Sequence, residues 1–113
     1  MATIRGKVAI VTGSARGIGA GIAKRFGQEG AKVICLDRNP ADETVAAIKK
    51  TGGEAIAVRC DISKMDSIND AVNEILDRFA TIDILVNSAG LSKMASITDA
   101  CLLYTSDAAD DRI

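Results

Sequence analysis

A glycine-rich turn between a strand pattern and a helix pattern constrains this chain more than any other feature. Apolar residues of strand character at 8–11 are followed by glycines at positions 13, 17 and 19. A helix-period pattern of apolar residues then begins at Ile18 and reaches Phe26. The first turn of a helix has unpaired N–H groups and a partial positive charge. The stretch therefore predicts a phosphate-binding loop at the start of a helix.

Beyond this turn, the pattern alternates strands with helices. Strands are predicted at 7–12, 32–37, 54–59 and 82–86, with helices at 17–29, between 40 and the glycines at 52–53, and from about 64 to 79. Asn39 and Pro40 are predicted to start the second helix, and Ser63 with Asp66 to form a capping box for the third. Right-handed crossovers then give a doubly wound parallel α/β sheet with strand order 3-2-1-4.

Composition agrees with a helix-covered parallel sheet and excludes several other classes. Apolar residues make up 48% of the 113 residues, and only 3% are aromatic, which predicts a core of Val, Ile, Leu and Ala. A net charge of −1 without a basic stretch argues against nucleic acid or membrane partners. The chain has no histidine, and its three cysteines lack C-x-x-C spacing, so no metal site is expected. A cytoplasmic protein is the expectation.

An acid at the end of the second predicted strand indicates how a nucleotide would be held. In this fold the Asp37 carboxylate hydrogen-bonds the adenosine ribose hydroxyls, which favours NAD. A 2′-phosphate about 4 Å away would be repelled by roughly 4 kcal/mol at an effective dielectric constant near 20. Arg16 and Arg38 could instead hold that phosphate, so NADP remains the alternative cofactor. Asp37 could also be an ordinary solvated acid at a strand end.

Four motifs in this order resemble the short-chain dehydrogenase/reductase family over residues 1–100. They are Thr12-Gly13-Ser14-Ala15-Arg16-Gly17-Ile18-Gly19, Asp37, Cys60-Asp61-Ile62 and Asn87-Ser88-Ala89-Gly90. Bacterial 3-oxoacyl-carrier-protein reductases are similar over this span. The cofactor-binding residues that the resemblance implies are Gly13, Ser14, Arg16, Gly17, Ile18, Gly19, Asp37, Arg38, Asp61, Ile62, Asn87, Ala89 and Gly90.

The resemblance also assigns roles within this set. Asp61 and Ile62 would contact the adenine, although Asp61 could instead be only an acid at a helix start. Asn87, Ala89 and Gly90 would line the path to the nicotinamide ribose. Ser88 stands where the family has a second asparagine, and its smaller hydrogen-bonding capacity predicts a looser local network.

The implied protein is an NAD(P)-dependent oxidoreductase that interconverts an alcohol and a carbonyl on a small molecule, as a homo-oligomer. Residues 1–100 would be a partial, truncated Rossmann-type domain. The family's catalytic Tyr-x-x-x-Lys is not matched, because the single tyrosine, Tyr104, is followed four positions later by Ala108. No catalytic residue is therefore assigned, and the chain by itself is predicted to be inactive.

Residues 101–113 fit no part of the family pattern. Their sequence resembles one reading frame of a sequencing adapter, which predicts an artefact of library preparation; a native acidic tail is the alternative. A stand-alone nucleotide-binding or regulatory module, without catalysis, is the alternative for the chain as a whole.

Overall fold

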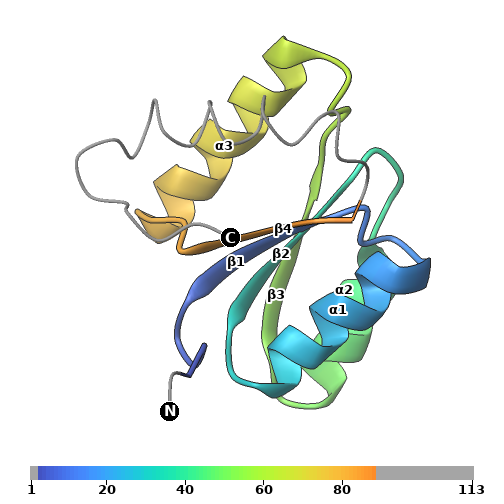
Figure 1. The fold of residues 1–113 in the computed structure, drawn as a ribbon, viewed down its shortest axis with the longest axis vertical. Coiled ribbons are helices and arrows are strands. Elements are labelled where there is room, and N and C mark those ends of the chain that lie inside the picture. The colour runs from blue at the N-terminus through green and yellow to red at the C-terminus, as the bar shows by residue number, and fades with distance from the viewer. Residues whose placement is uncertain (1–2, 89–113) are drawn as a thin grey trace.

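The computed structural model describes residues 3–88, in which strands and helices alternate (Figure 1). The elements are β1 (Val8–Thr12), α1 (Gly17–Gln28), β2 (Lys32–Asp37), α2 (Asp42–Lys50), β3 (Glu54–Arg59), α3 (Met65–Phe79) and β4 (Ile84–Asn87). Within this range no helix has the length and apolar character needed to cross a membrane.

The four strands form one parallel sheet in the order β3-β2-β1-β4, which confirms the predicted topology. Helices α1 and α2 lie on one face and α3 lies on the other (Figure 1). All strands point the same way, so their carboxyl ends meet at one edge of the sheet. That edge carries the loop after β1, Asp37, Asp61 and Asn87.

The core has two layers because successive strand residues face opposite sides of the sheet. Ile10 and Ile34 pack with Ile68 and Ile75 under α3. On the other face, Val11 and Val33 pack with apolar residues of α1 and α2. Every residue of β1 is buried, so this strand is the centre of the fold.

Two predicted helix starts are wrong. Helix α2 begins at Asp42 rather than at Pro40, and the Asn39 N–H donates to the Asp37 carboxylate at 2.9 Å. Helix α3 begins at Met65, and within residues 3–88 no side chain caps it, because the Ser63 hydroxyl donates to Asp61 instead. In both places an acid after a strand, Asp37 or Asp61, accepts a hydrogen bond from the residue that was expected to cap the helix.

Helix α1 lies very close to the turn after β1 at Gly19. A Cβ added there would lie 2.0 Å from the Gly13 carbonyl oxygen and 2.5 Å from the Ser88 hydroxyl oxygen. Both neighbours are held in place, since Gly13 belongs to the turn and Ser88 is hydrogen-bonded to Thr12. The residue at position 19 therefore has to lack a side chain.

We predict that G19A lowers the free energy of unfolding by about 3 kcal/mol, the upper range for overpacking, because the contacted atom is backbone. The matched control is G21A in the same helix, where an added Cβ meets no heavy atom of the described chain within 4 Å. G21A should leave stability unchanged or raise it by up to about 1 kcal/mol. Urea denaturation followed by circular dichroism measures both; equal stability of the two variants would contradict the packing argument.

Candidate functional site

The loop after β1 leaves the N-terminus of α1 open. Gly13 and Gly17 have φ angles of 62° and 67°, which L side chains rarely adopt. Arg16 precedes the helix, and within the described chain no side-chain hydrogen bond caps it. The Ile18 side chain is 80% exposed beside this turn. Helical N–H groups that lack a side-chain partner at an exposed turn favour an anion.

Hydrogen bonds join this loop to the end of β2. The Ala15 N–H donates to Asp37 Oδ2 at 2.9 Å, and the Asn39 N–H donates to Oδ1 at 2.9 Å. The Ser14 side chain is fully buried, and its hydroxyl donates to the Leu36 carbonyl at 3.3 Å. The Asp37 carboxylate is thus oriented by two backbone donors. The Ser14 side chain points into the protein interior.

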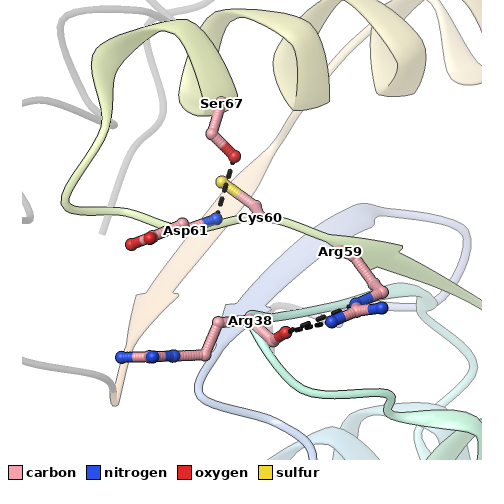
Figure 2. Close-up of a pocket in the computed structure, with 5 residues that line it drawn as sticks. All are labelled: Arg38, Arg59, Cys60, Asp61 and Ser67. Atoms are coloured by element: carbon pink, nitrogen blue, oxygen red, sulfur yellow. Dashed lines mark hydrogen bonds between the residues drawn. The ribbon is translucent and has the colours of Figure 1, made fainter.

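A cavity of about 300 Å³ lies beside the ends of β2 and β3. Figure 2 shows the residues that line it: Arg38, Arg59, Cys60, Asp61 and Ser67. The Arg59 guanidinium donates to the Arg38 carbonyl oxygen from Nε at 3.3 Å and from Nη2 at 3.0 Å. The Asp61 N–H donates to the Ser67 hydroxyl oxygen at 2.9 Å.

Sequence reasoning missed Arg59 and Ser67, which both act on backbone groups of the predicted site residues. The alternation of β3 places Arg59 among its exposed residues, but no motif marks it. Ser67 lies in the first turn of α3, which faces the end of β3. Contacts of a side chain with distant backbone depend on how the elements pack, so the sequence gives no signal for them.

Asp61 is a charged acceptor at the mouth of this cavity. The Ser63 hydroxyl and N–H donate to its Oδ1 at 2.6 and 3.0 Å, and these bonds lower the pKa of the Asp61 carboxyl. The nearby positive charge of Arg38 lowers that pKa further. Arg38 and Asp61 extend to the same side of the cavity (Figure 2). Ile62, which follows Asp61, packs against the core under α3.

At the end of β4, hydrogen bonds tie the chain to β1. The Thr12 hydroxyl donates to Asn87 Oδ1 at 3.0 Å. The Ser88 N–H donates to Thr12 Oγ1 at 3.0 Å, and its hydroxyl donates to the Thr12 carbonyl. The Ser88 side chain thus makes one hydrogen bond here and its backbone N–H makes another, and the looser network relative to an asparagine stays a prediction. Ala89 and Gly90 lie outside the described residues.

Together, these features would suit an anion joined to a polar ring-bearing group. The open helix start suits a phosphate, the fixed Asp37 carboxylate suits hydroxyl donors, and the cavity beside Asp61 has room for a flat polar group. An added Cβ at Gly17 would meet no heavy atom of residues 3–88 within 4 Å. Among residues 3–88, no group of three His, Cys, Asp or Glu side chains could hold a metal ion.

Comparison with known proteins gives one consistent result. Residues 7–106 match the family model described as short chain dehydrogenase. The chain is 44% identical over 92 residues to glucose 1-dehydrogenase 2 of Bacillus subtilis, covering 79% of this chain and 36% of that protein. It is 41% identical over 99 residues to 3beta-hydroxysteroid dehydrogenase 1 of Eggerthella lenta, covering 85% and 38%. The chain thus spans little more than a third of these curated relatives.

Solved structures agree with the sequence relatives. A hydroxysteroid dehydrogenase from Escherichia coli superposes with a TM-score of 0.85 at 28% identity, covering 91% of this chain and 54% of the other. A metagenomic short-chain oxidoreductase in complex with NADP gives a TM-score of 0.85 at 28% identity, covering 92% and 58%.

Cys35 and Cys60, which are buried near the ends of β2 and β3, provide a test of how tightly the residues beneath the site are packed. Burial raises the pKa of the Cys35 thiol from 9.0 to about 11, partly offset by a hydrogen bond with Ser14, and burial also raises the pKa of Cys60.

We predict that a C101S chain shows no thiol reactive toward Ellman's reagent at pH 8 until it is unfolded. Because the unfolded thiols ionise first, stability should fall as the pH rises from about 9 toward 11. Rapid labelling of the folded chain would contradict this packing.

Proposed function

Because the chain belongs to the short-chain dehydrogenase family, whose members are oxidoreductases that use NAD(P), we propose that it is the cofactor-binding part of an enzyme interconverting an alcohol and a carbonyl. The observation that carries the proposal is the hydrogen bond between the Ala15 N–H and the Asp37 carboxylate. It places a fixed acceptor for sugar hydroxyls directly beside a loop suited to phosphate.

The residues described above fit NAD(P) part by part. The open start of α1 would face the diphosphate, Asp37 would accept hydrogen bonds from the adenosine ribose, and Asp61 with Arg38 would lie along the adenine. Asn87, which pairs with Thr12 at the end of β4, would face the nicotinamide ribose. When bound, the cofactor would supply hydride transfer to or from the substrate carbon, and the alcohol proton would be exchanged with a group outside these residues.

Within this proposal, NAD is the preferred cofactor. Asp37 Oδ1 and Oδ2 each accept one backbone N–H, and each retains a lone pair for a ribose hydroxyl. A 2′-phosphate would meet the same carboxylate as a like charge. Arg38 lies near Asp61, whose negative charge competes with a 2′-phosphate for the guanidinium. Arg16, in the loop itself, is the residue that would favour NADP instead.

The proposal also covers which residues belong to the cofactor-binding domain and which known enzymes the full-length protein resembles. Residues 1–100 would form the cofactor half, residues 101–113 would not derive from the family, and the full-length enzyme would resemble 3-oxoacyl-carrier-protein reductases. Sequencing the source gene beyond codon 100 tests this. A continuous reading frame that encodes Tyr-x-x-x-Lys supports it, while an intact genomic junction into residues 101–113 contradicts the division.

We predict that the wild-type chain binds ADP-ribose at least tenfold more tightly than 2′-phospho-ADP-ribose, and that D37S reduces this ratio by about tenfold. The replacement removes the like charge that repels the 2′-phosphate and the main acceptor for the ribose hydroxyls; tenfold corresponds to about 1.4 kcal/mol. Isothermal titration calorimetry with both ligands measures the ratio.

The matched control is D77N, which removes one exposed negative charge near the C-terminal end of α3, away from the carboxyl edge of the sheet. It should leave the ratio unchanged. Equal binding of the two ligands by the wild-type chain would overturn the preference for NAD, and no binding of either would overturn the proposed function in this chain.

A further inference from the structure

We propose that Thr44 of α2 is a positioning residue that sets the orientation of both the glycine loop and the Asp37 carboxylate. The inference rests on the proposed function and adds a residue that no motif or comparison singles out. Thr44 lies in the first turn of α2, nearly 30 residues along the chain from the loop. Its side chain is only 2% exposed.

The Thr44 hydroxyl bonds to the loop and not to its own helix. A helical threonine commonly donates to the carbonyl three or four residues earlier. Here Thr44 Oγ1 donates to the Ser14 carbonyl oxygen at 2.8 Å, with the Ala15 carbonyl at 3.4 Å. The first of these bonds is buried, so the carbonyl depends on this donor in place of water.

One peptide unit connects Thr44 with Asp37. The carbonyl that Thr44 holds belongs to the peptide between Ser14 and Ala15, and the N–H of that same planar unit donates to Asp37 Oδ2 at 2.9 Å. Because a peptide is rigid and its N–H and C=O point in opposite directions, fixing the oxygen also fixes the hydrogen. Thr44 therefore turns loop carbonyls toward α2 and the N–H toward the carboxylate.

The consequence for binding is selective. Without the hydroxyl, the Ser14–Ala15 peptide can rotate, which would release Asp37 from its orientation and allow a carbonyl oxygen to approach the diphosphate. Both changes would lower the affinity for an anionic ligand that carries a ribose. A purely structural role for Thr44 would weaken folding without any dependence on Asp37.

A double-mutant cycle on the full chain tests the inference, with ADP-ribose as the ligand and the folded fraction of each variant measured by circular dichroism. T44V keeps the shape and removes the donor; it should raise the Kd about fivefold in the wild-type background, the scale of one lost hydrogen bond. In a D37S background T44V should raise the Kd by only about twofold, because the effect through Asp37 is gone and only the effect of the loop carbonyl on the diphosphate remains. T44S keeps the hydroxyl and should remain within twofold of wild type.

The matched control is T51V, which removes a hydroxyl bonded locally to the Ile48 carbonyl at the other end of α2 and should not affect binding. If T44V does not fold, T44A also lacks the donor and is judged by the same criteria. An unchanged Kd in T44V, or equal weakening in both backgrounds, would overturn the inference. Failure of the wild-type chain to bind ADP-ribose would instead contradict the proposed function, and the inference with it.

Discussion

The hydrogen bond from the Ala15 N–H to the Asp37 carboxylate connects the loop after β1 to the acid at the end of β2, the two parts on which the site depends. The donor belongs to the turn after β1, and the acceptor ends the neighbouring strand β2. Parallel pairing places both at the same edge, so the contact follows from the topology and needs no long loop. Without it, the loop would still bond to the Leu36 carbonyl through Ser14, but the Asp37 side chain would lose the donor that orients it toward the loop.

Small residues make this arrangement possible. At Gly19 the helix lies directly against the Gly13 carbonyl, which leaves no room for a side chain. The positive φ angles of Gly13 and Gly17 turn the chain sharply enough for α1 to start beside the strand end. The start of α1 has no side-chain cap in the described structure, and a ligand could take the place of one. This geometry supports the proposed phosphate-binding role of the turn.

Much of this architecture could be predicted from the sequence, because apolar periodicity and glycine spacing report directly on strands, helices and one turn. The strand order and the bounds of β3 were predictable for that reason. The starts of α2 and α3 were not, since Asp37 and Asp61 hold the backbone of the turns before them. The contacts of Thr44 and Arg59 were also hidden, because each joins a side chain to distant backbone that only the packed fold brings near.

The central claim is that the turn after β1 and the end of β2 act as one binding surface. Amide chemical shifts of the ¹⁵N-labelled chain during titration with ADP-ribose test it most directly, since they report each backbone position separately. We expect the largest shifts at Gly17, Ile18 and the amides around Asp37, with little change at the far end of α3 near Asp77. Shifts centred on α3, or shifts in the turn without any at β2, would contradict the account.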